Sequence, residues 1–301
     1  MKTLSLKERA KEYLEPVPKV VLMVTDTASC NLNCGCCYLP YKGIRSPQST
    51  LRIVENLRDK FRLSIAGAEN LLYPEYLKAY QAANQKYILT NGILLNQKPE
   101  LFDLLKEYGI EEIQISYDPK DQKGGNKGLK EVVERVTRAA KEKGFWVRLG
   151  CVINAENYQE VDEMCDQVKA TGADGVVFFN LMKSGNAKTQ DKQALTEEQK
   201  EEFFQKVDEA RKRFPKEEFE IRINGTFGPK KGSAGEKLAQ ENKYCPAGEQ
   251  IFSVDPSDNV YGCPYLMETD PIGQLVDESR LEITNTLCNG DRSKCMADLL
   301  G

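Results

Sequence analysis

Three cysteines near the start of the chain have a spacing suited to chemistry at a metal cluster. Cys30, Cys34 and Cys37 are separated by three residues and then by two. Four thiolates complete the coordination of a cubane iron–sulfur cluster, whereas three thiolates leave one iron open to a small molecule. The spacing therefore predicts a [4Fe-4S] cluster whose fourth iron takes part in a reaction. Because Cys36 lies in the same stretch, a structural zinc site is the alternative interpretation.

The composition also favours thiolate ligands. The 301 residues include ten cysteines and no histidine. No segment has the pattern of an export signal, so we expect reduced thiols that bind metal rather than a disulfide framework. Without histidine, any proton transfer must use Asp, Glu, Lys, Tyr, Cys or water.

The charge balance bears on the partners of the protein. Lys and Arg number 42 against 46 Asp and Glu, so no strongly basic surface for nucleic acid or an anionic membrane is expected. No apolar run reaches the length needed to cross a bilayer. We expect a cytoplasmic protein without a nucleic-acid or membrane partner.

The elements that must position the cysteines follow a repeating pattern. Short β-branched runs alternate with amphipathic stretches between residues 19 and 180, which predicts parallel β-α units. The expected strands are Lys19–Thr25, Arg62–Ala66, Lys86–Leu89, Glu112–Ser116, Trp146–Ile153 and Gly175–Asn180. The expected helices are Thr50–Lys60, Pro74–Ala83, Pro99–Tyr108, Gly128–Lys143 and Tyr158–Thr171. The pattern predicts an α/β fold, a partial (β/α)6 TIM-like barrel with its chemistry at the C-terminal strand ends.

The remainder of the chain predicts three parts. A short segment, residues 1–18, precedes the barrel, which with a following helix at Leu195–Arg213 and a strand at Phe219–Ile223 occupies residues 19–228. Residues 229–301 predict a small cysteine-rich extension, introduced by a flexible connection at residues 229–235. Two short strands are expected there, at Ile251–Val254 and Val260–Gly262.

The cysteine motif after a first strand resembles the radical S-adenosylmethionine (radical SAM) superfamily. Members carry this spacing, usually with an aromatic residue next to the last cysteine, here Tyr38. The resemblance implies that Cys30, Cys34 and Cys37 bind the cluster and that the amine and carboxylate of S-adenosylmethionine bind its fourth iron. Reductive cleavage would give a 5′-deoxyadenosyl radical that abstracts hydrogen from a substrate carbon, with electrons from a flavodoxin- or ferredoxin-type donor. Cys36 matches no ligand position, and we interpret it as structural or incidental.

Further positions extend the resemblance. Gly67-Ala68-Glu69-Asn70 stands where the family has Gly-Gly-Glu-Pro, whose backbone meets the methionyl amine, and Thr90-Asn91-Gly92 matches a common Thr-Asn-Gly, although a simple turn is equally consistent. Ser116 and Asp118 match a strand ending in Ser-x-Asp, or else are ordinary turn and cap residues. The residues expected to bind the cofactor are Tyr38, Gly67, Ala68, Glu69, Asn91, Ser116, Asp118 and Arg148.

The fifth expected strand has two possible registers. Strand alternation puts Arg148 and Gly150 on one face and Leu149 and Cys151 on the other. The resemblance favours Arg148 inside the barrel, with Cys151 packed outside. In the opposite register Cys151 faces the radical and becomes a candidate hydrogen-atom donor.

A second set of four cysteines is widely spaced near the C-terminus. The surroundings of Cys245 and Cys263 resemble the auxiliary-cluster extensions called SPASM and twitch domains. The resemblance implies a second [4Fe-4S] cluster bound by Cys245, Cys263, Cys288 and Cys295, with structural zinc as the alternative. Cys165, on an expected helix, is interpreted as a buried apolar side chain.

Three functions remain open at this point. The resemblance favours maturation of a ribosomally made peptide, by a crosslink or by epimerisation. Only about eighteen residues precede the first strand, too few for the leader-binding module of many such enzymes, so a radical dehydrogenase or epimerase of a small sugar-like molecule is the alternative. A non-catalytic iron–sulfur or zinc protein is the hypothesis of another class, although a carrier does not need a barrel.

Overall fold

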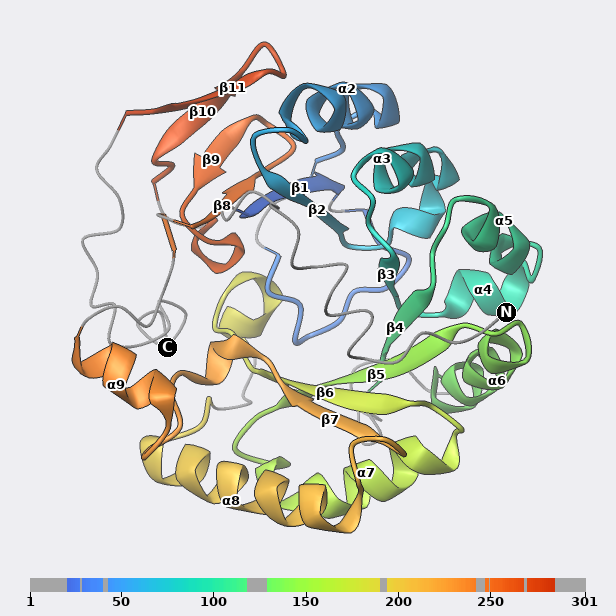
Figure 1. Cartoon of the computed structure of the whole chain (residues 1–301), viewed down its shortest axis with the longest axis vertical. Coiled ribbons are helices and arrows are strands. Elements are labelled where there is room, and N and C mark those ends of the chain that lie inside the picture. The colour runs from blue at the N-terminus through green and yellow to red at the C-terminus, as the bar shows by residue number, and fades with distance from the viewer. Residues whose placement is uncertain are drawn as a thin grey trace.

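The computed structural model describes residues 21–27, 29–39, 43–117, 129–189, 194–241, 247–248, 250–267 and 270–284. Parallel strands form a partial barrel with helices on its outside (Figure 1). Its strands are β1 (Val21–Thr27), β2 (Arg62–Gly67), β3 (Tyr87–Thr90), β4 (Glu112–Ser116), β5 (Trp146–Ile153), β6 (Gly175–Asn180) and β7 (Glu220–Ile223). The expected partial TIM-like α/β barrel is confirmed.

The helices follow the strands in the order that the sequence predicts. The α-helices are α2 (Pro47–Leu57), α3 (Leu77–Ala82), α4 (Ile93–Gln97), α5 (Leu101–Glu107), α6 (Leu129–Glu142), α7 (Val161–Ala170), α8 (Glu197–Arg213) and α9 (Ala234–Gln240). Short 3-10 turns are η1 (Asn70–Leu72), η2 (Pro74–Tyr76), η3 (Tyr158–Glu160), η4 (Gly185–Thr189), η5 (Gly225–Phe227) and η6 (Pro264–Leu266). Sequence patterns missed α4 and α9, which are short, and α9 begins inside the stretch expected to be a flexible connection.

The barrel strands belong to two sheets, and a side chain joins them. Strands β1 and β2 lie in one sheet and β3 to β7 in the other. The amide of Gln85 bridges the seam: it accepts from the backbone N–H of Ile65 on β2 (2.6 Å) and donates to the carbonyl of Tyr87 on β3 (3.1 Å). Gln85 thus supplies hydrogen bonds where β2 and β3 form no backbone ladder.

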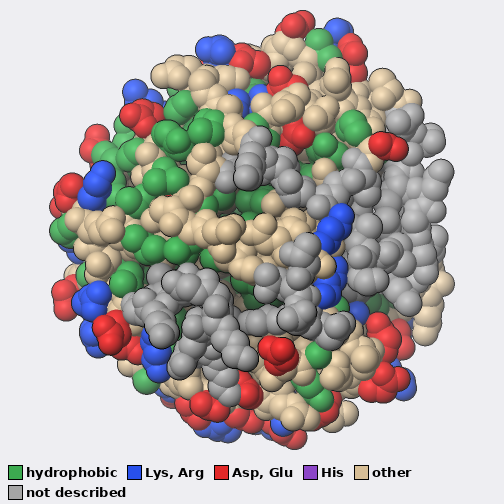
Figure 2. Space-filling model, turned by 180° about the vertical axis from the view of Figure 1, so that it is seen from behind, with side chains coloured by type: hydrophobic (Ala, Val, Ile, Leu, Met, Phe, Trp, Pro, Cys, Tyr) green, Lys and Arg blue, Asp and Glu red, His purple; other side chains and the backbone are tan. Residues whose placement is uncertain are grey.

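The core lies between the strands and the outer helices. On β5, the buried residues Leu149 and Cys151 belong to the same apolar core as Val136 and Ala140 of α6. Burial on β5 is nearly continuous, as expected for a parallel strand that is covered on both faces. Figure 2 shows apolar side chains gathered across the middle of one face of the molecule, with acidic and basic side chains interspersed around its edge.

The cysteine-bearing extension continues the first sheet. Strand β8 (Ile251–Val254) pairs in parallel with β1, and β9 (Asn259–Tyr261), β10 (Gly273–Val276) and β11 (Arg280–Ile283) follow as an antiparallel meander. The buried Arg45 guanidinium donates to the carboxylate of Asp258 and to the carbonyl of Asp255, which fastens the extension to the barrel. The boundary expected near residue 228 stays a prediction.

None of the helices in the described part of the chain has the length and apolar character that a bilayer span requires.

Candidate functional site

The cysteine loop begins where β1 ends, at the C-terminal ends of the parallel strands. The Ser29 N–H donates to Thr27 Oγ1 (2.9 Å), which turns the chain out of the strand. The segment after β2 then bonds to the start of the loop: the Ala68 N–H donates to the Thr27 carbonyl (2.9 Å) and the Glu69 N–H to the Ser29 carbonyl (3.1 Å). Residues expected to contact a cofactor are therefore hydrogen-bonded directly to the loop that carries the cysteines.

Hydrogen-bond donors point at the first cysteine. The Leu32 N–H lies 3.4 Å from Cys30 Sγ and Asn91 Nδ2 lies 3.7 Å from it. A turn closed by the Cys37 N–H and the Cys34 carbonyl (3.2 Å) brings the later cysteines back toward the loop. Burial raises the pKa of the Cys30 thiol, the N–H donors oppose this, and the nearby Cys37 thiol adds to it. N–H donors to sulfur suit a thiolate that ligates a cluster.

This donor set fits a cubane. Three thiols and N–H groups directed at sulfur are the ligand chemistry that such a cluster uses. Within the described ranges, no three potential ligands converge on one point in the way that ligands of a single ion do. A cubane does not require such convergence, since each thiolate binds an iron of its own.

Glu69 connects two strand ends beside the loop. Its fully buried carboxylate accepts from Thr90 Oγ1 (2.9 Å) and from the Asn91 N–H (2.8 Å). Asn91 Nδ2 in turn donates to Asn31 Oδ1 of the cysteine loop (2.7 Å). Burial raises the pKa of Glu69 to about 6, against the effect of these hydrogen bonds. The carboxylate therefore fixes the Thr-Asn-Gly turn against the loop.

A segment after β6 holds the same loop from the other side, and we call Ser184–Ala187 the clamp segment. Ser184 Oγ donates to the carbonyl of Tyr38 (2.8 Å), and Asn186 Nδ2 donates to the carbonyl of Cys34 (3.0 Å). Both bonds reach backbone oxygens within the cysteine motif. The clamp segment thus fixes the course of the loop and, through it, the positions of the thiols.

Gly185 makes the close approach of the clamp segment possible. Its φ is +58°, and a Cβ atom there would lie 2.8 Å from the Cys37 carbonyl oxygen and 2.7 Å from that of Leu39. Only glycine combines this backbone conformation with such contact. Sequence reasoning missed this segment, because a glycine after a strand is an ordinary turn signal.

Tyr38 links the cysteine loop to the extension. Its ring lies 4.9 Å from the ring of Tyr265, measured between centroids. Burial, together with the neighbouring thiols of Cys37 and Cys263, raises the pKa of Tyr38 to about 12. Cys263 therefore lies on the side of the extension that faces the cysteine loop.

Comparison with known proteins places this geometry in a family. Residues 24–168 match the model of the radical SAM superfamily. This part of the chain belongs to the radical SAM superfamily. The matched range thus includes the end of β1, the cysteine loop, Glu69, Asn91 and β2 to β5.

Three relatives illustrate the range of similarity. A PqqA peptide cyclase of Granulibacter bethesdensis is 26% identical over 213 residues, which is 65% of this chain and 56% of the relative. An Fe-coproporphyrin III synthase of Methanosarcina barkeri is 25% identical over 182 residues, 56% of this chain and 45% of the relative. SuiB of Streptococcus suis, solved with its precursor peptide SuiA, superposes with a TM-score of 0.67 at 16% identity, covering 98% of this chain and 67% of SuiB. The chain spans about half the length of the curated relatives it matches.

Arg148, one of the residues expected to bind the cofactor, lies away from the cysteine loop. Arg148 is the third residue of β5, near the N-terminal strand ends, where it lies 3.6 Å from Glu112 and 3.6 Å from Glu220. The cysteine loop leaves the opposite ends of the strands. The guanidinium forms ion pairs with carboxylates at the other end of the barrel, so its position does not support cofactor binding, which stays a prediction.

The register of β5 is the one that the resemblance favours. A Cβ on Gly150 would lie 3.3 Å from the amide of Gln114 on β4 and 3.2 Å from Phe179 on β6, so this face is the interior of the barrel. Cys151 is buried in the apolar core on the opposite face. It does not face the barrel interior, so its candidacy as a hydrogen-atom donor is not supported. Cys165 is also buried in that core, as expected.

Of the remaining expected site residues, some lie within the described ranges and others lie outside them. Ser116 ends β4 as an exposed residue, paired in register with Gly150. Asp118, Cys245, Cys288 and Cys295 lie outside the described residues. Ala247 and Gly248 follow Cys245 closely in sequence, and the Gly248 N–H donates to the carbonyl of Gly262, the neighbour of Cys263 (3.0 Å).

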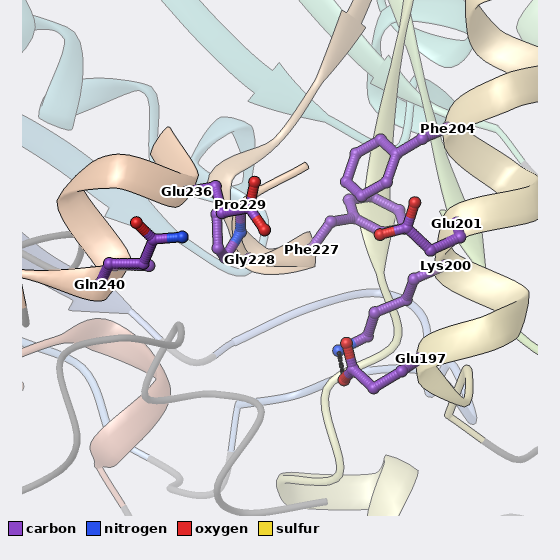
Figure 3. A pocket seen from close by; sticks show the side chains of 10 residues that line it. Glu197, Lys200, Glu201, Phe204, Phe227, Gly228, Pro229, Glu236 and Gln240 are labelled. Carbon is purple, nitrogen blue, oxygen red and sulfur yellow. Dashed lines mark hydrogen bonds and ion pairs between the residues drawn. The ribbon is translucent and has the colours of Figure 1, made fainter. Parts of the chain in front are cut away.

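A cavity of about 240 Å³ lies elsewhere, between the start of α8 on one side and α9 with the residues that precede it on the other (Figure 3). Lys200 lines it and forms an ion pair with Glu197 (3.1 Å), and Phe204 and Phe227 supply its apolar wall. No cysteine is among its lining residues. The cavity is therefore separate from the site built around the loop.

Proposed function

We propose that this chain is a radical SAM enzyme that modifies a ribosomally made peptide. The observation that carries the proposal is the three-cysteine loop at the C-terminal strand ends, with N–H donors directed at Cys30 Sγ. Cys30, Cys34 and Cys37 would hold a [4Fe-4S] cluster. When bound, the cluster and S-adenosylmethionine supply reductive cleavage of the sulfonium and hydrogen abstraction from a substrate carbon.

The chain's own residues contribute position rather than proton transfer. The Gly67–Ala68 backbone lies beside the loop and is suited to receive the methionyl amine, while Glu69 and Asn91 hold the two loops together. Tyr38 and Ser116 remain proposed cofactor contacts, from the loop and from the exposed end of β4. Barrel walls around this site would exclude water from a reactive species.

The peptide class is supported by the names of two relatives. One is called a PqqA peptide cyclase and another was solved with a precursor peptide. A second class, the modification of a small molecule, is supported by the relative named an Fe-coproporphyrin III synthase. We propose crosslinking or epimerisation of a peptide first, and a dehydrogenase or epimerase acting on a small molecule second.

The auxiliary cluster is part of the same proposal. Cys263 lies beside Tyr38, which adjoins Cys37, so a cluster held by Cys245, Cys263, Cys288 and Cys295 would lie next to the first. The auxiliary cluster would accept an electron from the substrate or would anchor the substrate. A flavodoxin- or ferredoxin-type protein would supply electrons to the first cluster.

One experiment tests the reaction. Protein reconstituted anaerobically with iron and sulfide should bind about eight irons, four in each cubane. With dithionite and S-adenosylmethionine it should then release 5′-deoxyadenosine. Zinc in place of iron, with no cleavage, would contradict the proposal and favour the non-catalytic alternative.

A second experiment distinguishes the substrate classes. Candidate precursor peptides and small molecules carrying deuterium are incubated with the reconstituted protein. The true substrate passes deuterium into 5′-deoxyadenosine, which mass spectrometry detects. Transfer from a small molecule, and from no peptide encoded beside the gene, would reject the peptide class.

A further inference from the structure

Asp26, near the end of β1, has a carboxylate in which only one of the two oxygens accepts a hydrogen bond from a described residue. The residue is completely buried, and its Oδ2 accepts from Asn70 Nδ2 (3.0 Å). Its Oδ1 has no hydrogen-bond partner among the described residues. A buried carboxylate oxygen without a donor is costly, because it has lost its water and gained nothing in exchange.

Asn70 also has a buried side-chain oxygen without a hydrogen-bond partner among the described residues. Its Nδ2 donates to Asp26 and also to the hydroxyl of Tyr80 (2.9 Å), while its Oδ1 lacks a partner in the described structure. A Cβ atom on Gly67 would lie 2.6 Å from Asp26 Oδ1 and closer still to Asn70 Oδ1. The two unpaired oxygens therefore lie together over the Cα atom of Gly67.

One proton satisfies both oxygens. If Asp26 is a neutral acid, its Oδ1–H donates to Asn70 Oδ1 while Asn70 Nδ2 donates to Asp26 Oδ2, which closes a ring of two hydrogen bonds. Exchanging the oxygen and nitrogen of the Asn70 amide does not remove the need for this proton, since one contact would still join two acceptors. An ionised Asp26 would leave two acceptors facing each other without water.

We propose that Asp26 and Asn70 form a neutral acid–amide pair that positions the Gly67–Glu69 stretch beside the cysteine loop. The pair packs directly on Gly67, and the next backbone N–H, of Ala68, bonds to the carbonyl of Thr27. The proposal rests on the proposed function where it concerns S-adenosylmethionine, because this stretch is the one expected to meet its amine. It also gives a role to the asparagine that stands at the proline position of the related motif.

The groups around Asp26 agree with a neutral acid. Burial raises the pKa of Asp26 to about 8, although the backbone N–H groups, Asn70 and Arg45 all oppose this. The Arg45 guanidinium is already committed to the acceptors of the extension. Tyr76 and Tyr80 are the other titratable side chains that face the site, and both have pKa values raised above that of free tyrosine. They stay neutral donors at physiological pH.

An isosteric variant separates the proton from the shape. Asp26→Asn replaces the acid O–H by an amide N–H, which can donate to Asn70 at every pH. The folded pKa of Asp26 is above that of an unfolded aspartate, so the wild-type chain loses stability as pH rises between these values. Relative to Asp26→Asn, the wild-type ratio of folded to unfolded protein should fall up to tenfold per pH unit from about pH 4 to 8.

The measurement is chemical denaturation of the full chain without reconstituted iron, from pH 5 to 9. Parallel pH profiles of the wild type and Asp26→Asn would overturn the neutral pair, and so would an Asp26→Asn chain that fails to fold. Asp26→Ala should be destabilised at every pH, because it leaves Asn70 Oδ1 unpaired. The infrared carbonyl band of a protonated carboxyl should be present in the wild type and missing in Asp26→Asn.

Binding to reconstituted protein tests the positioning role. The wild type should lose affinity for S-adenosylmethionine above about pH 8, whereas Asp26→Asn should keep its affinity. Identical pH dependence of binding in the two proteins would overturn the positioning role. Absence of binding by both at every pH would contradict the proposed function instead, and the denaturation profiles would still decide whether the pair exists.

Discussion

The two ends of the barrel are stabilised by different kinds of contact. At the C-terminal strand ends, the cysteine loop is held by neutral hydrogen bonds from Asn91 and Asn186 and by the close approach of Gly185. At the opposite ends, Arg148 lies between carboxylates, among them the buried Glu220. The groups that contact the cysteine loop directly are neutral donors, and the Glu69 carboxylate acts on the loop through Asn91, whereas at the opposite ends of the strands cations and carboxylates pair directly.

The cysteine loop should show the largest effect. Cys37→Ala removes one of the three thiols and should abolish both the first cluster and the release of 5′-deoxyadenosine. Cys36→Ala, one residue earlier, is the matched control and should keep nearly all of the iron and the activity. Iron content and product yield after identical reconstitution provide the measurement. The opposite result would exchange the two cysteines in the ligand set.

The clamp segment should show the next largest effect. Gly185→Ala forces a Cβ against the carbonyls of Cys37 and Leu39 at a φ of +58°, which should cost about 3 kcal/mol of unfolding free energy. Gly172→Ala is the matched control, because Gly172 has a φ of +87° and open space around it, and should cost about 1 kcal/mol.

The position of Gly185 adds a second readout. If the clamp segment fixes the thiols, Gly185→Ala should also lose iron to a chelator several times faster than the wild type, while Gly172→Ala should not. Equal rates of iron loss in the two variants would mean that the clamp segment contributes to stability alone.

Arg148 tests the contacts at the N-terminal ends of the barrel strands, opposite the cysteine loop. Arg148→Met removes the cation that lies 3.6 Å from Glu112 and from Glu220. We expect a loss of about 2 kcal/mol in unfolding free energy, less than for an isolated buried pair, because Arg222 still pairs with Glu220 at 2.8 Å. Affinity for S-adenosylmethionine should not change. Weaker binding without a loss of stability would restore Arg148 as a cofactor residue.

Arg222, which also pairs with Glu220, supplies the control for Arg148→Met. Arg222→Met removes a cation from the same carboxylate cluster, but 46% of the Arg222 side chain is accessible to solvent. Its loss should therefore cost less than that of Arg148. If both variants lose equal stability, burial is not the reason for the importance of Arg148.

The sequence predicted the barrel well because its strands carry a strong local signal. The bounds of Glu112–Ser116, Trp146–Ile153 and Gly175–Asn180 agree with β4, β5 and β6 to the residue. Strands β5 and β6 are buried almost throughout, as expected for parallel strands that are covered on both faces, and β4 alternates in burial. Strands β10 and β11 were missed, because they are four residues each, and residues 277 and 278 between them adopt left-handed conformations without a glycine.

The site was less predictable than the fold. Motif spacing located the loop and its neighbours, since the residues that meet there follow β1, β2 and β3. Strand alternation predicted which face of the sheet Arg148 lies on, but it does not say how far the side chain is from the cysteine loop. The clamp segment and the Asp26–Asn70 pair depend on contacts between residues far apart in sequence, which no local pattern records.

The junction of the extension should show the smallest effect. Glu278 accepts from Ser49 Oγ (2.5 Å) and from Arg52 Nε (2.5 Å), which joins the turn between β10 and β11 to α2. The hydrogen bond from Arg52 is the main reason that the pKa of Glu278 lies below its ordinary value. This contribution to stability is present above the pKa of an unfolded glutamate and is lost as pH falls through the folded pKa, the reverse of Asp26.

Glu278→Gln keeps the left-handed backbone at this position and changes only the charge. It should cost less than about 1 kcal/mol near neutral pH, because the pair is partly exposed, and the difference from the wild type should vanish in acid. Glu282→Gln, on β11 beside Arg280, is the matched control and should change stability even less. If Glu278→Gln instead lowered iron content or release of 5′-deoxyadenosine, this junction would also set the position of the extension at the cysteine loop, where Tyr265 contacts Tyr38.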